Sequence, residues 1–280
     1  MESALYIVPT PIGNKDDITK RAIDVLTNAT LIAAEDTRHT KGLLDMLSIP
    51  AKKMISCNDH NEEERATLII DEIKKGGIVA LASDAGTPLI SDPGYRVVSI
   101  CAKHNVKVIP LPGACAAITA LEGSGLPTDR FLFRGFLPVK NKDLIKVFED
   151  VKESNITTVF YESPRRIIDT LEVIKTVMPE NPICLARELT KCFETFYRGK
   201  AFEILDTIKS HDNHTKGEFV LIIGPIIHMT DTKDELSKDV LECIDSLKDF
   251  VPSKVLSTSL AKLCNLNKKD LYNYIASNKS

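Results

Sequence analysis

The sequence lacks the motifs that mark several common active sites. It contains no GxGxxG or GxxxxGK[ST] segment after a strand-like run, which argues against the usual ways of binding nucleotide phosphates. It contains no GxSxG turn, no HExxH helix and no Cys/His cluster with metal-ligand spacing. We therefore expect neither a serine-hydrolase site nor a bound metal ion.

Long hydrophobic runs and cysteine pairs are also absent. No apolar run approaches the roughly 20 residues that span a bilayer, and no signal-peptide pattern precedes the first strand-like run, 4–8. The seven cysteines are odd in number and include no CxxC pair, which is typical of reduced, buried thiols. These absences predict a cytoplasmic protein without a membrane span.

The composition is that of a globular protein, with 43% hydrophobic and 27% charged residues among 280. The net charge of −3 gives no overall indication of nucleic-acid binding. Residues 130–200 carry 13 basic and 10 acidic groups, whereas 1–113 and 201–280 are net acidic. This excess favours an anionic partner only weakly, because a solvated surface often shows the same difference.

Short apolar runs alternate with helical patterns through the first 115 residues. This alternation predicts βαβ units and a parallel sheet that is covered on both faces. The expected strands are 5–8, 31–34, 78–82 and 106–111. The expected helices are 18–28, with Asp17 as the N-cap, 62–75 and 95–104.

A second series of strands and helices begins near residue 130. Its expected strands are 131–133, 157–161, 183–186, 195–198 and 219–223, and its expected helices are 142–151, 165–177 and 202–210. The strands near 185 and 196 have no helical spacer, which predicts an antiparallel pair and hence a mixed sheet.

The chain divides best at a segment rich in Gly and Pro, 122–127. We therefore expect an α/β domain over 1–122, a second α/β domain over 123–230 and a small helical extension over 231–280. In the extension, 233–249 and 253–277 show helical patterns. Residues 255–275 resemble a helix-turn-helix, although a helical hairpin packed on the body explains the pattern equally well.

The loop 83–94 is the strongest local feature of the sequence. It follows a predicted strand, precedes a predicted helix, and consists mostly of Gly, Pro, Ser, Asp and Thr. Ligands bind beyond the carboxyl ends of strands in open α/β sheets, and connections there usually have only ~2–6 residues. Its length favours a ligand-binding loop over an ordinary connection.

Two further loops occupy the same position after their strands, namely 9–14 and 112–117. Their small residues would let a ligand approach the backbone closely. The alanines of the second loop are also explained by helix packing.

The chain resembles the tetrapyrrole methylase superfamily and, within it, the small-subunit ribosomal RNA methyltransferase I family. The matching segments run in order along nearly the whole chain, and they are 5–14, 34–38, 83–94, 110–114, 161–166, 186–191 and 216–220. Tetrapyrrole-methylating relatives carry Gly-Asp-Pro where this chain has Gly86-Thr87-Pro88, and their first loop is rich in Gly. Both differences favour the RNA-modifying branch.

The resemblance implies a homodimeric α/β enzyme of two domains, with S-adenosylmethionine bound in the cleft between them. It implies 2′-O-methylation of a cytidine ribose in the decoding region of 16S-type rRNA, and hence the small ribosomal subunit as partner. The residues that we expect at the cofactor are Thr10, Pro11, Ser83, Asp84, Gly86, Thr87, Leu89, Ile90, Ser91, Gly113, Ala114, Ala186, Arg187, Gly217, Glu218 and Phe219.

A weakly acidic ribose hydroxyl reacts faster with a base nearby, and Glu35, Asp36 and Glu162 are the candidates. The other explanation of Glu35 and Asp36 is capping of the helix that follows them.

Arg38, Arg165 and Arg166 are the candidates for RNA contact, because a guanidinium binds phosphate and stacks on bases. Pro164 is expected at the first position of a helix, where it would direct the two neighbouring arginines outward. Salt bridges to nearby carboxylates explain the arginines equally simply.

Two other functions stay open on the sequence. One is methylation of a small tetrapyrrole or other non-RNA acceptor, and the other is a non-enzymatic RNA-binding or ribosome-associated module. The arginines count against the first, and the presence of every cleft loop counts against the second.

Overall fold

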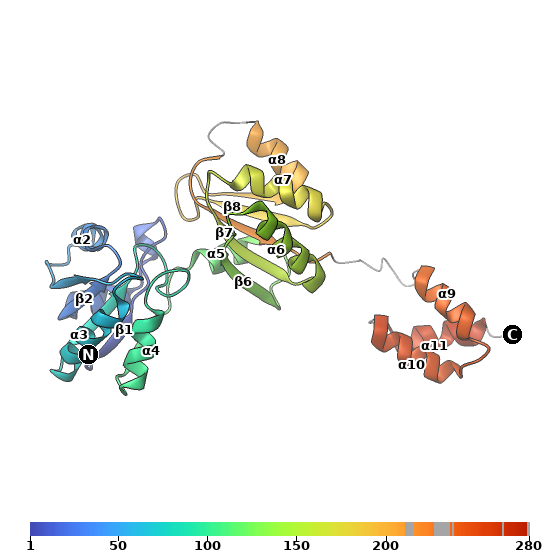
Figure 1. Ribbon diagram of the computed structural model, residues 1–280, viewed down its shortest axis with the longest axis horizontal. Coiled ribbons are helices and arrows are strands. Elements are labelled where there is room, and N and C mark those ends of the chain that lie inside the picture. The colour runs from blue at the N-terminus through green and yellow to red at the C-terminus, as the bar shows by residue number, and fades with distance from the viewer. Residues whose placement is uncertain (211–214, 227–235, 237, 265, 279–280) are drawn as a thin grey trace. The chain divides into compact units, whose positions relative to one another are not determined.

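The computed structural model describes residues 1–280 except 211–214, 227–235, 237, 265 and 279–280 (Figure 1). The chain folds into two compact units, Met1–Ile226 and Ile227–Ser280. The first unit holds two five-stranded sheets, and the second holds three helices among its described residues. The boundary that the sequence suggests at residue 122 lies inside the first unit and stays a prediction.

The first sheet is entirely parallel, with the strand order β3-β2-β4-β1-β5. Its strands are β1 (Ala4–Ile7), β2 (Leu31–Ala34), β3 (Met54–Ser56), β4 (Ile78–Ala82) and β5 (Val108–Pro110). The helical segments between them are η1 (Lys15–Asp17), α1 (Lys20–Asn28), α2 (Thr37–Met46), α3 (Glu62–Lys74) and α4 (Tyr95–Lys103).

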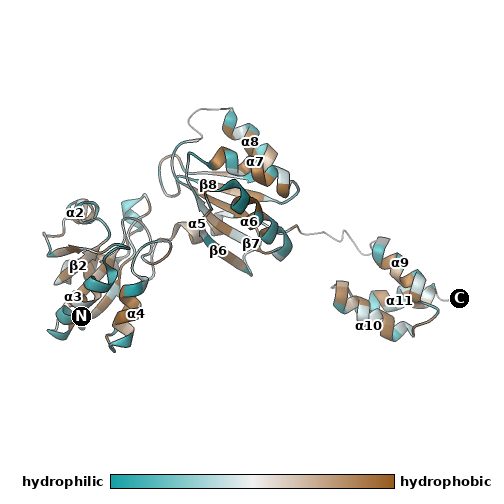
Figure 2. Cartoon of the chain, in the orientation of Figure 1, coloured by the Kyte–Doolittle hydropathy of each residue, from teal (hydrophilic) through white to brown (hydrophobic). Residues whose placement is uncertain are grey.

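Alternating side chains of β1 build two separate hydrophobic cores. Tyr6 packs into the core that also contains Leu26 of α1, whereas Ile7 packs into the core that contains Ile69 of α3 and Val97 of α4. Successive strand residues point to opposite faces, so the sheet needs a helical layer on each side. Figure 2 accordingly shows the strands mainly in brown and the helices with both brown and teal residues.

The second sheet is mixed, with the strand order β6-β7-β10-β8-β9. Only the β6–β7 pair is parallel among its four pairs. Its strands are β6 (Phe131–Phe136), β7 (Thr157–Glu162), β8 (Ile183–Arg187), β9 (Thr195–Gly199) and β10 (Phe219–Ile223). The helices around it are α5 (Ala116–Ser124), α6 (Asn141–Ser154), α7 (Ile167–Val177) and α8 (Ala201–Lys209).

The two faces of this sheet are covered differently. Side chains of α6, α7 and α8, such as Phe148, Leu171 and Ile204, pack on one face. Ala117 and Ala120 of α5 pack on the other, so the helix that leaves the first sheet closes the core of the second. The mixed second sheet and its antiparallel β8–β9 pair confirm the prediction made from the missing spacer.

The second unit contains α9 (Lys238–Leu247), α10 (Ser253–Cys264) and α11 (Lys268–Ser277). Val240 and Ile244 of α9 share one small core with Leu256 and Leu260 of α10 and with side chains of α11. The two helices that the helix-turn-helix pattern predicts within 253–277 are present as α10 and α11. Residues 233–235 and 237 of the other predicted helix, and Asn265 of the predicted turn, lie outside the described residues.

Several local predictions were wrong. Helix α1 begins after Thr19, whose hydroxyl accepts from Ala22 N, whereas Asp17 ends the short η1. Pro164 precedes α7 instead of opening it, because Arg166 is the N-cap. Helix α5 continues through Gly123 and Ser124, so the predicted linker is partly helical.

Candidate active site

The loop Ser83–Gly94 between β4 and α4 adopts a strained path. Gly86 and Gly94 have positive φ, and so do the non-glycine residues Leu89 (φ 73°) and Ser91 (φ 66°). A left-handed conformation is costly for residues with a Cβ and is concentrated at functional sites. The carboxylate of Glu62 accepts from Arg96 N and Val97 N, which caps α4 and fixes the end of the loop.

Hydrogen bonds join this loop to the loops after β1 and β5. Thr10 and Gly86 exchange two backbone hydrogen bonds, and the Thr87 hydroxyl donates to Ala114 O at 2.8 Å. Strands β4, β1 and β5 are neighbours in the sheet, so their carboxyl ends lie together. The three loops that the sequence singles out therefore form one assembly.

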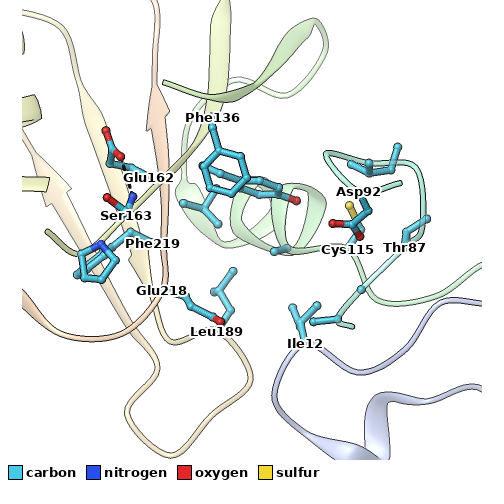
Figure 3. Close-up of a pocket in the computed structure, with 17 residues that line it drawn as sticks. Ile12, Thr87, Asp92, Cys115, Phe136, Glu162, Ser163, Leu189, Glu218 and Phe219 are labelled. Carbon is cyan, nitrogen blue, oxygen red and sulfur yellow. Dashed lines mark hydrogen bonds between the residues drawn. The ribbon is translucent and has the colours of Figure 1, made fainter. Parts of the chain in front are cut away.

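A pocket of about 400 Å³ lies between this assembly and the second sheet (Figure 3). Apolar side chains and backbone line most of it, as is usual for sites that bind small molecules of drug size. The lining residues are Ile12, Ala85, Gly86, Thr87, Ile90, Asp92, Cys115, Ala116, Phe136, Tyr161, Glu162, Ser163, Pro164, Leu189, Glu218, Phe219 and Val220.

Asp92 is the carboxylate of the strained loop that lines this pocket. Burial raises the pKa of Asp92 from 3.8 to about 6, against the opposing effect of a hydrogen bond from the Ser83 hydroxyl. The negative charges of Glu35, Asp84 and Asp59 raise it further. A carboxylate with a pKa near neutrality is suited to accept a proton in catalysis.

Glu35 and Asp84 brace the ends of β2 and β4. The carboxylate of Glu35 accepts from Asp84 N at 3.2 Å, and the carboxylate of Asp84 accepts from Asp36 N at 3.1 Å. Burial raises the pKa of Glu35. Neither side chain is among those that line the pocket, so their hydrogen bonds hold the start of the loop against the end of β2.

Asp36 and Arg38 form a local pair at the start of α2. Asp36 is the N-cap and accepts from Arg38 N, and its carboxylate also accepts two bonds from the Arg38 guanidinium. The guanidinium bonds hold the pKa of Asp36 well below its usual range. The Arg38 side chain is nonetheless 89% exposed, so it stays open to a partner.

Tyr161 brings an aromatic hydroxyl to the pocket from β7. Its ring makes edge contacts with Phe133 and Phe136 of β6, at centroid distances of 5.1 and 5.4 Å. Its hydroxyl interacts with the backbone of Ala117, in the first turn of α5, and with the side chain of Cys115. Burial raises the pKa of Tyr161, so its hydroxyl stays protonated near neutral pH.

The start of β10 forms the opposite wall and is held by an ion-pair network. Glu188 accepts from Glu218 N at 3.0 Å and from Lys191 Nζ at 3.0 Å, and Lys191 also pairs with Glu218. Gly217 (φ 103°) has no room for a Cβ, because Glu188 occupies that space. Phe219 lies both in the core beneath and along the pocket, so it can pack and line the site at once.

Glu162, a buried residue of the pocket lining, pairs with the partly buried Arg166. The Glu162 carboxylate accepts from Ser163 N, from the Thr170 hydroxyl and from Arg166, and its side chain is 1% exposed. Arg166 also donates to Leu137 O and Pro138 O. These bonds indicate a structural role for both residues, whereas Arg165 next to them is exposed.

The pocket unites part of the predicted site. Gly86, Thr87, Ile90, Glu218, Phe219 and Glu162 line it. The other predicted residues are not among those that line it, and they are Thr10, Pro11, Ser83, Asp84, Leu89, Ser91, Gly113, Ala114, Ala186, Arg187, Gly217, Glu35, Asp36, Arg38, Arg165 and Arg166. Sequence reasoning did not single out Asp92, Tyr161 or Phe136, although Asp92 belongs to the loop with the strongest local signal.

Within the described part of the chain, no group of three or more His, Cys, Asp or Glu side chains is arranged to hold a metal ion. The described helices also include none that is long and apolar enough to cross a membrane.

Comparison with known proteins identifies the family. Residues 4–205 match the family model of tetrapyrrole (corrin/porphyrin) methylases. The chain is 44% identical to ribosomal RNA small subunit methyltransferase I of Escherichia coli O157:H7, over 98% of this chain and 94% of that protein. It is also 44% identical to the protein of the same name from Haemophilus influenzae, over 96% and 95% of the two chains.

Solved structures agree on the fold. Uroporphyrin-III C-methyltransferase from Thermus thermophilus, solved in complex with S-adenosylhomocysteine, matches 79% of this chain and 97% of its own with a TM-score of 0.52 at 19% identity. The chain thus belongs to the tetrapyrrole methylases and, within them, to the ribosomal RNA small subunit methyltransferase I family.

Proposed function

We propose that this protein transfers the methyl group of S-adenosylmethionine to the 2′-hydroxyl of a cytidine ribose in the decoding region of small-subunit rRNA. The names of its full-length relatives support an rRNA substrate. The observation that carries the proposal is the pocket of about 400 Å³ into which the strained loop brings Asp92. Such a site has room for the cofactor and a base for the acceptor hydroxyl.

The residues of the pocket fit S-adenosylmethionine. Ala85, Gly86 and Thr87 line one wall of the pocket, and Phe219 and Val220 line another that is apolar. Bound there, S-adenosylmethionine supplies an electrophilic methyl group on a cationic sulfur. Of the other predicted cofactor residues, Thr10 and Ala114 hold the loop through hydrogen bonds to it.

Asp92 is our candidate for the base. It faces the pocket, and its pKa of about 6 leaves it mostly ionised at neutral pH yet able to take a proton from the ribose hydroxyl. Glu35, one of the candidates from the sequence, is here the second candidate for the base; its negative charge raises the pKa of Asp92, and its carboxylate accepts from Asp84 N. The protonated Tyr161 hydroxyl lies in the same pocket and orients what binds there.

Arg38 and Arg165 are our candidates for contact with the RNA backbone. Both side chains are exposed, and each follows the carboxyl end of a strand, β2 for Arg38 and β7 for Arg165. A guanidinium in this position matches phosphate in charge and geometry.

We also propose that the protein acts as a homodimer in the cytoplasm. Strand β6 is an edge of the second sheet and exposes Phe131, Leu132 and Phe136. A sheet edge with exposed large apolar side chains favours pairing with another chain. Phe136 also lines the pocket, so a second copy at this edge would help to close it. Light scattering after gel filtration measures the mass, and a monomer at micromolar concentration would contradict the homodimer.

A side-by-side transfer assay tests the function. Labelled S-adenosylmethionine is incubated with the protein and with small ribosomal subunits, naked small-subunit rRNA or a porphyrinoid. We expect label in RNA, released as 2′-O-methylcytidine after nuclease digestion. Label on the porphyrinoid alone would favour the other branch of the family, and binding to subunits without transfer would favour a non-enzymatic module.

A further inference from the structure

The two C-terminal helices carry a charge that the chain as a whole lacks. The protein has a net charge of −3, but the stretch 253–278 contains Lys254, Lys262, Lys268 and Lys269 against the single acidic residue Asp270. All four lysines are exposed or partly exposed. A local basic surface on an acidic protein is characteristic of a site for a polyanion.

The helical period places three of these four lysines, Lys254, Lys262 and Lys269, opposite the small core. In α10, Leu256 and Leu260 point inward, and Lys254 and Lys262 lie two turns apart on the other face. In α11, Leu271 and Ile275 point inward, and Lys269 lies on the face opposite to them. Each helix therefore packs one face on the core of the unit and presents the other to solvent.

Helix α11 adds groups that interact with bases. Tyr272 and Tyr274 are 44% and 39% exposed, and Asn273 between them is also exposed. Aromatic rings stack on unpaired bases, and an amide hydrogen-bonds to base edges. Asn273 follows Lys269 by one helical turn, so an amide and a cation lie on the same stripe.

The start of α11 is rigidly defined. The side chain of Asn267 accepts from Lys269 N at 2.8 Å and from Asp270 N at 3.4 Å, so it caps the helix on which Lys268 and Lys269 are the first two residues. In helix-turn-helix proteins, the N-terminal residues of the second helix contact the nucleic acid. The order α10, short turn, α11 matches that arrangement.

We propose that α10 and α11 form a second RNA-binding surface, which holds unpaired nucleotides of the same rRNA through Lys268, Lys269 and Tyr272. This inference rests on the proposed function for the identity of the RNA. It assigns affinity for the substrate to the helical unit, separately from the chemistry in the first unit. Exposed Phe250 and Leu263 offer the competing explanation of a protein partner, which the experiment distinguishes.

The test uses the full-length protein with Lys268→Glu/Lys269→Glu, and with Lys74→Glu/Lys75→Glu as the matched control. The control pair is also adjacent and exposed, lies at the end of α3, and changes the net charge equally. Glutamate is favoured in the first turn of a helix, so the test variant keeps α11 folded. Circular dichroism and calorimetric binding of S-adenosylmethionine check that both variants are intact.

Filter binding to naked small-subunit rRNA and to small ribosomal subunits is then measured from low to high salt. We expect the test variant to lose about tenfold or more in affinity for both ligands, and its salt slope to fall by about 1.4, or ~0.7 for each lost contact to single-stranded RNA. The control should keep wild-type affinity and slope. Tyr272→Ala should weaken binding about tenfold, and Tyr272→Phe, which keeps the ring, should restore it.

The outcomes separate this inference from the proposed function. If the wild type transfers methyl groups to rRNA but the test variant binds like the control, the second surface is refuted and the function stands. If the test variant loses affinity for subunits but not for naked rRNA, the helices dock on a ribosomal protein and the inference is overturned. If the wild type binds rRNA through α11 without methyl transfer, the proposed function fails and the binding surface stands.

Discussion

Thr10 and Gly86 are joined in both directions: Thr10 N donates to Gly86 O at 2.9 Å, and Gly86 N donates to Thr10 O at 3.0 Å. This bridge connects the loops that follow β1 and β4. The backbone at Gly86 is also left-handed, with a φ of +79°, and a Cβ at this position would lie 3.1 Å from Ile12 Cγ2. The conformation favours glycine, and a Cβ there would also require Ile12 to shift by a few tenths of an ångström.

Gly86→Ala should therefore damage cofactor binding. We expect a loss of stability of about 1–2 kcal/mol from the left-handed conformation, and affinity for S-adenosylmethionine lower by about tenfold. Calorimetry measures both. Gly42→Ala is the control: it lies within α2, where a Cβ meets no described atom within 4 Å, and it should raise stability by up to ~1 kcal/mol. Wild-type binding by Gly86→Ala would contradict the role of the bridge.

Asp92→Asn should reduce turnover by about 10²-fold or more while S-adenosylmethionine still binds. In the wild type, turnover should rise with pH through about 6, where Asp92 ionises. Glu35→Gln keeps an oxygen acceptor for Asp84 N, so it should lose less activity than Asp92→Asn. Rate profiles from pH 5 to 8 decide between them: a severe defect in Glu35→Gln with a mild one in Asp92→Asn would make Glu35 the base.

The raised pKa of Asp92 should also make the stability of the protein depend on pH. Its pKa in the folded protein lies above its ordinary value of 3.8, so the fold favours the protonated form. The contribution of Asp92 to stability is then full below pH 4 and is lost as the pH rises through about 6. Asp92→Asn should accordingly unfold at higher denaturant concentration than the wild type at pH 7, with a smaller difference at pH 4. A variant less stable at pH 7 would contradict this sign.

Arg166→Ala should lower stability, whereas Arg165→Ala should weaken RNA binding, although the two residues are neighbours. Removing Arg166 leaves the buried Glu162 carboxylate without its ionic partner, which should cost about 3–5 kcal/mol in urea unfolding. Removing the exposed Arg165 should leave stability within about 0.5 kcal/mol and reduce the salt slope of RNA binding by ~1. Equal unfolding midpoints for the two variants would show that the buried pair does not stabilise the fold.

Thiol labelling should follow burial. Cys57, Cys101 and Cys184 are buried, and burial raises the pKa of each thiol to about 11, whereas Cys192 and Cys264 are exposed. At pH 8, a thiol with that pKa has on the order of 100-fold less thiolate than an ordinary cysteine. Mass spectrometry after a short iodoacetamide pulse should find label on the two exposed residues first. Early label on Cys101 would show that α4 opens in solution.

Strands and helices with a clear hydrophobic pattern could be predicted from the sequence. Very short elements and contacts between distant segments could not. Fully buried strands such as β1 and β10 read as continuous apolar runs. Strand β3 was missed, because three residues at a sheet edge show no period. The capping of α4 by Glu62 could not be predicted, since it depends on two helices 34 residues apart lying side by side.

The sequence predicted where the site lies in the fold, but it did not predict which side chains line it. The length and composition of the loop 83–94 indicated a ligand site. The sequence of the loop does not show which of its carboxylates points into the pocket. That choice follows from the left-handed residues Leu89 and Ser91, whose conformation their residue types do not predict. The Glu162–Arg166 pair could not be predicted from its spacing either, because Glu162 ends β7 and Arg166 is the N-cap of α7, so the two do not share a helix.

The central position of β1 also has a consequence for how the protein is made. Strand β1 spans Ala4–Ile7, yet its partners are β4 at 78–82 and β5 at 108–110. During synthesis β1 therefore lacks its partner on one side until about a hundred further residues have been made. The bridge from Thr10 to Gly86 likewise joins distant parts of the chain, so this wall of the binding site cannot form before β4 and the start of its loop have been made.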